Sequence, residues 1–561
     1  MAIRPKAAVA IILSFCLTAF AACDNSSAPQ KPDISSPSAS PTKESPNAQD
    51  FGDTLVAESI GDASNLIPFL AADSASAGVA DAVFGQLMRL DKNYDLIPGM
   101  AEKWDVSADQ KTITFHLRKN IKWHDGAHFS ADDLLFQYEM MVHPDVPSAY
   151  KEDFMQIQKA EAPDDFTFRV TFKEPYAPAL VRMAGMTGLP RHLLKGTKPA
   201  DLIKSPLARN PVGNGAWRFV EWKAQTHIIL ESNPAHYLGR PMIAKNITRV
   251  IPDPATQFLE LKSGGIDMMS LQPLQYLKQT DGEYFQKNYR KYKYLANAYT
   301  YMGYNMQRPM FADKRVRQAI TYAIDKRELI DGVLMGLGQE ADVPYKPGTW
   351  AYKSDVKKYT YDPAKAAALL KEAGWSQKNS EGYLVKDGKP FEFEIITNQG
   401  NPLRAKTAEI LQQRLKQVGI KVGVRVLEWS SFINNFINKR NFDACILGWS
   451  LGIDPDQYEI WNSKKTGEHE LNFISYSNAE VDKILDDARR TFNKEARKKL
   501  YHRFQDILAD EQPYTFLYVP EALPIVSSRV RGIDPGPAGI AYNFDEWWIP
   551  KAGHKRPVIT K

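Results

Sequence analysis

Cysteine is scarce in this sequence, which has three cysteines among 561 residues. Cys16 and Cys23 lie near the N-terminus, inside or at the end of what reads as an export signal, and Cys445 lies far from both. The exported chain therefore has no pair of cysteines for an internal disulfide. Cys445, between Ala444 and Ile446, is expected to be a small buried residue in a strand rather than a reactive thiol.

Neither a large excess of one charge nor a basic tract is present. Lys and Arg number 71 against 66 Asp and Glu, a formal net charge of +5. Binding to a phosphate backbone needs clustered positive charge, so no nucleic-acid partner is expected. The apolar content of 43% and charged content of 24% are typical of a soluble globular protein, and the length predicts two or three domains.

No apolar run at the N-terminus is long enough to span a bilayer. Residues 7–20 are apolar and follow Arg4 and Lys6, which is the pattern of an export signal. The ending Ala21-Ala22-Cys23 resembles a bacterial lipoprotein box, in which the cysteine carries lipid and becomes the first residue of the mature chain. Ordinary signal peptidase would also accept the small residues before Cys23, so free secretion stays open.

We therefore predict a signal peptide at residues 1–22 and lipidation of Cys23. Residues 23–50 are rich in Ser and Pro and poor in large apolar groups, which predicts a disordered tether. The protein is expected to be exported and held on the periplasmic or cell-surface face of a membrane.

The folded part, from about residue 51, mixes strand and helix patterns. An opening strand is predicted at residues 53–61, and apolar residues alternate as in half-buried strands within residues 112–120 and 166–174. Ser130 followed by Asp133 forms a capping box and predicts a helix start.

Further helix starts are marked in the second half of the chain. The spacing of apolar residues predicts a helix from about residue 314, with Asp325 and Glu328 opening a second one. Asp362 followed by Pro363 predicts the start of another helix.

From residue 391 onward, strand and helix patterns alternate. The predicted elements are strands at 391–398, 420–429 and 443–449, with helices at 403–418 and 432–437. Such alternation predicts a parallel sheet covered on both faces, and open sheets of this kind bind ligands at the carboxyl ends of their strands. The ligand loops would be residues 397–404 and 448–456.

The second of these loops contains Gly448-Trp449-Ser450-Leu451-Gly452, which has the G-x-S-x-G spacing of a nucleophile elbow. A serine hydrolase using Ser450 is therefore an alternative of a different class. A nucleophile elbow needs a helix to begin at the serine, whereas Asp454 followed by Pro455 is the better helix start here. We expect a binding protein and no enzyme.

Segments along almost the whole chain, from Asp53 to Pro550, resemble bacterial extracellular solute-binding family 5, the dipeptide- and oligopeptide-binding proteins that serve ABC importers. The likeness is carried by "AEKWDVSADQKTITFHLRKNIKWHDGAHFSADDLLFQYE", "NPVGNGAWRFVEW", "NPAHYLGRPMIAKNITRVIPDPATQFLELKSGGIDM", "YMGYNMQRPMFADKRVRQAITYAIDKRELI", "YDPAKAAALLKEAGW" and "LGWSLGIDPDQY".

The resemblance implies an α/β protein with the two-lobed periplasmic binding protein fold, class II, of the three-domain dipeptide/oligopeptide-binding type. Domain I would comprise residues 51–84, 204–299 and 523–561. Domain II would comprise residues 85–203, and domain III residues 300–522.

By the same resemblance, the protein is expected to capture di- or oligopeptides between the lobes and deliver them to membrane permease subunits with their ATPases, which are separate chains. It would act as a monomer, with no cofactor and no metal. The alternative within the family is a nonpeptide solute, an oligosaccharide or a metal chelate. The candidate ligand-binding residues are Glu58, Ser59, Gly61, Arg404, Gly448, Trp449, Ser450, Leu451 and Asp454.

Two of these residues have competing interpretations. Peptide-binding members carry an aspartate, for the ligand amine, three residues after the tryptophan, where this chain has Gly452. Asp454 is the nearest substitute and could serve only as a helix cap. Arg404 could hold a ligand carboxylate or be a solvated first-turn residue. The charged run at residues 486–499 is predicted to be a solvated helix face.

Overall fold

The computed structural model describes residues 45–71, 73–148, 150–468 and 470–556. The predicted signal peptide, Cys23 and most of the predicted tether lie outside the described residues. The predicted end of the tether at residue 50 is wrong, because η1 (Ala48–Asp50) is a 3-10 helix. The buried Asp50 carboxylate accepts a hydrogen bond of 3.0 Å from the Lys551 backbone nitrogen. The folded chain therefore begins before residue 51.

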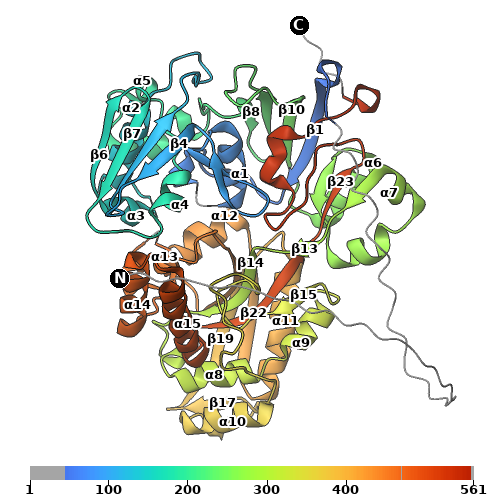
Figure 1. Cartoon of the computed structure of the whole chain (residues 1–561). Coiled ribbons are helices and arrows are strands. Elements are labelled where there is room, and N and C mark those ends of the chain that lie inside the picture. The colour runs from blue at the N-terminus through green and yellow to red at the C-terminus, as the bar shows by residue number, and fades with distance from the viewer. Residues whose placement is uncertain (1–44, 72, 149, 469, 557–561) are drawn as a thin grey trace, which may run out of the picture. The chain divides into compact units, whose positions relative to one another are not determined.

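The chain forms two lobes joined by crossing strands, as Figure 1 shows. We call residues 45–291 and 524–556 the first lobe and residues 294–522 the second lobe. The first lobe contains sheets ordered β1-β10-β9-β8, β4-β5-β7-β6, β2-β3 and β11-β23-β12. The division of the chain into domains I, II and III stays a prediction.

The strands of the first lobe are β1 (Gly52–Ser59), β2 (Met88–Leu90), β3 (Leu96–Pro98), β4 (Ala101–Val106), β5 (Thr112–Leu117), β6 (Ile157–Asp164), β7 (Thr167–Phe172), β8 (Trp217–Lys223), β9 (His227–Ser232), β10 (Ile243–Val250), β11 (Met268–Ser270), β12 (Tyr289–Lys291) and β23 (Pro524–Ser527). Its helices are α1 (Ser74–Val83), α2 (Ala131–Val142), α3 (Lys151–Met155), α4 (Ala179–Ala184), α5 (Arg191–Leu194), α6 (Pro254–Ser263) and α7 (Glu283–Asn288). Short 3-10 or π turns are η2 (Pro68–Leu70), η3 (Pro199–Lys204), η4 (Pro206–Ala208), η5 (Gln275–Gln279), η9 (Ala541–Glu546) and η10 (Lys551–Gly553).

The second lobe is built on one mixed sheet with the order β13-β22-β14-β21-β19-β20, and β15 pairs with β22. Its strands, with the small sheet β16-β17-β18, are β13 (Tyr294–Leu295), β14 (Ala298–Tyr304), β15 (Gly338–Glu340), β16 (Gln377–Lys378), β17 (Leu384–Lys386), β18 (Lys389–Pro390), β19 (Glu392–Asn398), β20 (Lys421–Leu427), β21 (Ala444–Ser450) and β22 (Tyr514–Ala522). The helices are α8 (Lys314–Tyr322), α9 (Lys326–Gly332), α10 (Pro363–Glu372), α11 (Pro402–Gln417), α12 (Trp429–Ser431), α13 (Tyr458–Trp461), α14 (Ala479–Arg490) and α15 (Lys494–Glu511), with η6 (Pro309–Phe311), η7 (Phe432–Ile437) and η8 (Ser463–Lys465).

The predicted alternation in the second lobe is confirmed for three strands, because β19 runs parallel to both β20 and β21. The sheet as a whole is mixed, since β14 pairs antiparallel with β21 and β22. Apolar side chains cover both faces: Met302 and Ile446 belong to one core cluster, and Tyr301 and Cys445 to another. Cys445 is fully buried, as predicted.

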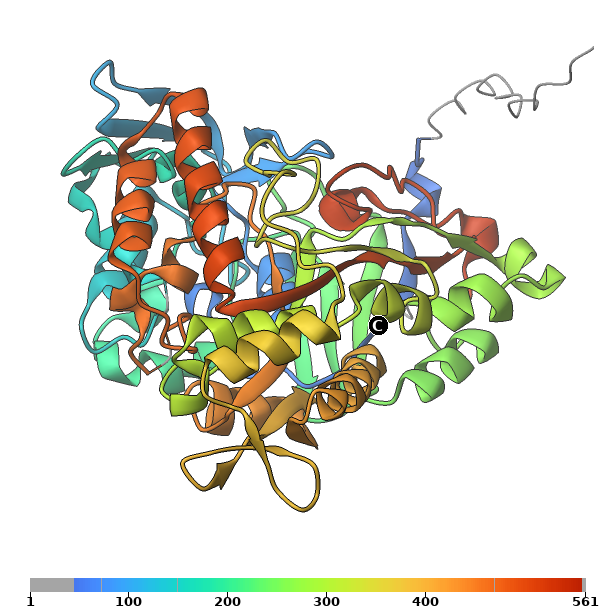
Figure 2. The same ribbon diagram turned by 90° about the horizontal axis from the view of Figure 1, so that it is seen from below.

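The chain crosses between the lobes beside β13 and again between β22 and β23. Tyr294 of β13 pairs with Ala522 at the end of β22, so the two crossings are hydrogen-bonded to each other. Figure 2 follows the red strand β22 from the end of α15 across to β23. These neighbouring strands form the covalent connection about which two lobes of this kind can open and close.

Candidate functional site

The end of β21 offers a strand edge to the gap between the lobes. On one side, β14 pairs with β21 along its whole length, as far as Ala298 opposite Ser450. On the other side, the parallel ladder with β19 ends at Ile396 and Cys445. Within the described part of the chain, residues 448–450 therefore have no strand beside their β19-facing edge. An extended ligand backbone could hydrogen-bond there as an added strand.

Arg404 lies next to this open edge. It is in the first turn of α11, where the Asn401 side chain caps the helix by accepting from the Arg404 backbone nitrogen at 3.1 Å. The Arg404 guanidinium donates to Asn398 Oδ1 at 2.8 Å and lies over Gly448, where a Cβ atom would be 2.9 Å from Arg404 Nη2.

The charge of Arg404 has no counter-ion in the described residues, where the guanidinium donates to the amide oxygen of Asn398. Burial lowers the pKa of Arg404 from its usual value, although a guanidinium keeps its proton at physiological pH. A half-buried cation of this kind favours an anionic ligand group.

Residues of the second lobe hold the Trp449 side chain and the Leu451 backbone in place. The Trp449 indole donates to Tyr514 Oη at 3.3 Å and packs on Phe473 with ring centroids 5.8 Å apart. The Leu451 backbone exchanges hydrogen bonds with Asn297, whose side chain donates to Leu451 O at 2.6 Å. Trp449 and Leu451 are both half-buried, so a ligand can contact their exposed part while these hydrogen bonds and ring contacts stay in place.

The end of β1 meets the same region from the first lobe. Gly61 lies beside Trp429, with a Cβ atom expected 3.7 Å from Trp429 Cδ1. Gly400, just before α11, would place a Cβ atom 3.5 Å from Ile60 Cβ. The end of β1 therefore adjoins the turn that leads into α11 and Arg404.

The polar residues of this strand end differ in how they are held. Ser59 donates to the Gly61 carbonyl at 2.7 Å. The Glu58 carboxylate accepts from the Gln257 side chain at 3.2 Å, and burial raises the pKa of Glu58. Among the candidate residues, Glu58 is therefore the one whose buried carboxylate a cationic ligand group would stabilise most.

Asp454 does not cap a helix, so that interpretation is wrong. The next helix, α13, starts at Tyr458 with Gln457 at its N-cap. Both Asp454 carboxylate oxygens accept from Arg497 at 2.7 Å. A role for Asp454 in ligand binding would have to compete with this bidentate pair.

Ser450 lacks the setting of a nucleophile elbow. It is the last residue of β21, it is exposed, and seven loop residues separate it from α13 at Tyr458. A helix N-terminus that could supply an oxyanion hole does not begin at Ser450.

The prediction that residues 486–499 form a solvated face is wrong for two arginines. Arg489 and Arg497 are 5% and 6% exposed and are paired with the carboxylates of Asp456 and Asp454, respectively. The sequence contains a signal for the burial of Arg489, because Arg489 follows the buried Leu485 by four residues and so shares its helix face.

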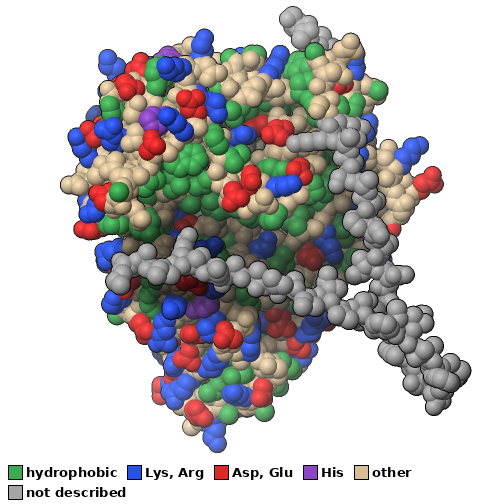
Figure 3. All heavy atoms as spheres, in the orientation of Figure 1, with side chains coloured by type: hydrophobic (Ala, Val, Ile, Leu, Met, Phe, Trp, Pro, Cys, Tyr) green, Lys and Arg blue, Asp and Glu red, His purple; other side chains and the backbone are tan. Residues whose placement is uncertain are grey.

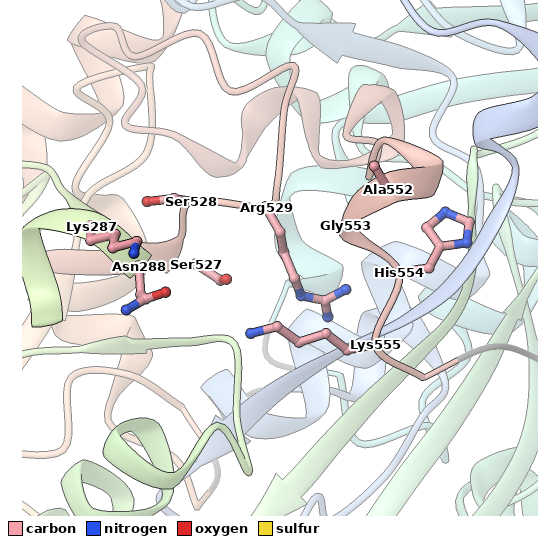
Figure 4. Close-up of a pocket in the computed structure, with 9 residues that line it drawn as sticks. All are labelled: Lys287, Asn288, Ser527, Ser528, Arg529, Ala552, Gly553, His554 and Lys555. Carbon is pink, nitrogen blue, oxygen red and sulfur yellow. The ribbon is translucent and has the colours of Figure 1, made fainter.

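Two surface hollows lie elsewhere, in the first lobe near the C-terminal residues. One of about 300 Å³ is lined by Lys287, Ser528, Arg529 and Lys555 (Figure 4), and one of about 460 Å³ adjoins Phe51. Neither contains a candidate ligand residue. The space-filling view shows instead a hollowed band between the lobes, with apolar side chains along its upper rim (Figure 3).

Nowhere among the described residues do three or more His, Cys, Asp or Glu side chains gather as a metal ion would require. No helix in this part of the chain is both long and apolar enough to cross a membrane.

Residues 95–469 match the family described as bacterial extracellular solute-binding proteins, family 5 Middle. The chain belongs to family 5 of the bacterial extracellular solute-binding proteins, and its fold is the two-lobed α/β fold of that family, as predicted.

Over 521 residues the chain is 33% identical to the oligopeptide-binding protein AppA of Bacillus subtilis (strain 168), covering 91% of this chain and 94% of that protein. The structure of AppA in complex with a nonapeptide is similar with a TM-score of 0.84 and 31% identity, covering 89% of this chain and 99% of that one.

Two other solved structures bind different solutes. NikZ from Campylobacter jejuni in complex with Ni(L-His) has a TM-score of 0.80 at 30% identity, over 89% of this chain and 99% of that one. DppA from Helicobacter pylori in complex with the peptide STSA has a TM-score of 0.80 at 27% identity, over 90% of this chain and 99% of that one.

Proposed function

We propose that this protein captures peptides between its lobes and delivers them unaltered to the membrane permease of an ABC importer. The observation that carries the proposal is the open edge of residues 448–450 beside Arg404. A peptide backbone can pair with the edge whatever its side chains, while its terminal carboxylate meets the guanidinium. Contacts from the end of β1 would then favour the closed form over the open one.

The peptide proposal is tested by mass spectrometry of what copurifies with the exported protein. Peptides of mixed sequence and narrow length are expected. The similarity to NikZ gives a second candidate, a metal chelate whose carboxylate occupies Arg404, and elemental analysis of the same sample would reveal it. A bound chelate or glycan in place of peptides would overturn the proposal.

We expect Ser450→Ala to leave peptide affinity within about twofold of the parent protein, because a backbone edge does not need the hydroxyl. Titration calorimetry measures the affinity, and incubation of bound peptides followed by mass spectrometry detects cleavage. Peptide cleavage by the parent protein that disappears in the variant would restore the hydrolase alternative.

We propose that Cys23 anchors the protein to the membrane through lipid and that the folded part is monomeric. Replacing Cys23 by serine is expected to move the protein from the membrane fraction to the soluble exported fraction, since a thioether-linked lipid can no longer form. Fractionation and intact-mass measurement check this, with Cys16→Ser as the matched control. A parent protein whose mass shows no lipid would favour ordinary secretion.

A further inference from the structure

Charged residues from both lobes meet in a cluster on the side of the molecule opposite the crossing strands. Asp153 on α3 and Arg182 on α4 come from the first lobe, while Asp456 before α13 and Arg489 on α14 come from the second. Figure 1 shows α3 and α4 facing α13 and α14 on the side opposite β13 and β22. We call these four residues the cross-lobe cluster.

The cross-lobe cluster contains one ion pair within each lobe. Arg182 Nε lies 2.9 Å from Asp153 Oδ2, and Arg489 Nη2 lies 2.7 Å from Asp456 Oδ2. Each lobe therefore contributes a pair with no net charge. When the lobes separate, neither half is left with a buried charge that has lost its only partner.

Contact between the lobes adds bonds that run across the gap. Arg489 Nη2 lies 2.8 Å from Asp153 Oδ1, and Arg182 Nη2 lies 3.1 Å from Asp456 Oδ2. The backbone nitrogen of Ala177 also donates to the Arg489 carbonyl at 2.7 Å. The side chains of Asp153 and Asp456 are 1% and 0% exposed, so the bonds between them and the arginines form out of water.

We propose that the cross-lobe cluster is a reversible latch that holds the closed form and so slows release of the captured solute. The latch rests on the proposed function, since it presumes that the solute lies between the lobes. Its four residues are positioning residues, because they act by fixing the lobes and the loop from Leu451 to Asp456. That loop continues directly from the open edge of β21.

Glu459 makes the latch sensitive to protons. Burial, and after it the negative charge of Asp153 across the gap, raise the pKa of Glu459, while Arg489 and Lys465 lower it, and together these effects place the pKa at about 7. Glu152 and Glu470 face Lys465 at 3.9 and 3.5 Å.

The direction of the pH effect follows from the contribution of Asp153 to the pKa of Glu459, because this contribution exists only when the lobes meet. Because closure raises this carboxyl pKa, the closed form takes up a proton, and closure weakens as the pH rises through about 7. Retention is therefore expected to be longer at pH 6 than at pH 8, and Glu459→Gln should remove the difference.

The latch is tested with the mature chain labelled at Lys119→Cys and Lys499→Cys, exposed positions in the two lobes. A synthetic nonapeptide pool with free termini is bound, and release is followed as loss of energy transfer after dilution. Asp153→Asn leaves Arg182 and Arg489 facing each other with one fewer acid between them. We expect release roughly tenfold faster in this variant.

The double variant Asp153→Asn/Arg182→Gln removes a neutral pair and should release the pool more slowly than Asp153→Asn alone. The reversal is expected because the double variant leaves no unpaired charge in the first lobe, whereas Asp153→Asn leaves Arg182 without its carboxylate there. Asp132→Asn is the matched control, since Asp132 pairs with Arg191 at 3.4 Å on the surface of the same lobe.

The outcomes separate the two proposals. A parent protein that does not retain the pool contradicts the proposed function. Retention by the parent with unchanged release from Asp153→Asn, or a double variant that releases faster still, overturns the latch. If Asp153→Asn does not fold, Arg182→Gln takes its place, because it removes the cation that lies 3.1 Å from Asp456 across the gap, and unchanged release in that variant has the same meaning.

Discussion

Replacing Arg404 by glutamine is expected to weaken binding of peptides that carry a free terminal carboxylate. A charge-assisted hydrogen bond contributes about 1.5–3 kcal/mol, which corresponds to roughly a 10- to 150-fold loss of affinity. Arg404 donates to an amide oxygen of Asn398 and has no carboxylate partner in the described residues, so its charge is available to the ligand. Titration calorimetry with one peptide in acid and amide forms measures the effect.

The amidated peptide should bind the parent protein and Arg404→Gln about equally, because the arginine then meets no anion. Lys406→Gln on the same helix is the matched control, since the exposed Lys406 pairs with Glu409 at 3.3 Å and points away from Gly448 by position on the helix. An equal loss for both peptide forms would mean that Arg404 supports the turn before α11 and does not read the carboxylate.

Replacing Arg529 by methionine is expected to reduce the free energy of unfolding by about 3–5 kcal/mol. The Arg529 guanidinium binds Asp267 in a bidentate pair of 2.8 and 3.1 Å and also donates to Asp53 and to the Thr54 carbonyl at 2.8 Å. Arg529 and both aspartates are buried, so its removal would leave two carboxylates without their main cation. Urea unfolding followed by circular dichroism measures the loss.

The loss from Arg529→Met should shrink in acid. Burial opposes ionisation of Asp53, but backbone donors from Lys555 and Thr54, together with Arg529, leave its pKa below the usual 3.8. A lowered carboxyl pKa stabilises the fold above that value and ceases to do so as the pH falls. Arg218→Met is the control, since the half-exposed pair of Arg218 with Glu231 should contribute less than about 1 kcal/mol. A stability loss that is the same for both variants would contradict the role of the buried network.

Local features of the fold followed from the sequence. The predicted capping box is present, with the Ser130 backbone nitrogen donating to Asp133 at 3.0 Å, and α10 begins at Pro363 after the Asp362 cap. Such signals involve neighbouring residues, so they can be interpreted without knowing the tertiary structure. The family resemblance supplied the arrangement in two lobes, which periodicity alone could not.

The sequence patterns could not predict which strands or charged residues pair when they lie far apart in the chain. Alternation from residue 391 predicted parallel strands but gave no sign that β14 would insert antiparallel beside β21. The charge of Arg489 predicts a solvated residue, although Arg489 lies on the apolar face of α14. Its acidic partner Asp153 lies 336 residues away, where no spacing rule applies.

The network around Asp53 has a consequence for biogenesis. Asp53 opens the first strand, yet it accepts bonds from Arg529, 476 residues later, and from the Lys555 and Arg556 backbone. The strand that contains Asp53 therefore lacks these hydrogen-bond donors until residues 529–556 have been made. Translocation of an unfolded polypeptide benefits from such a delay, because the N-terminal half cannot reach its full stability prematurely.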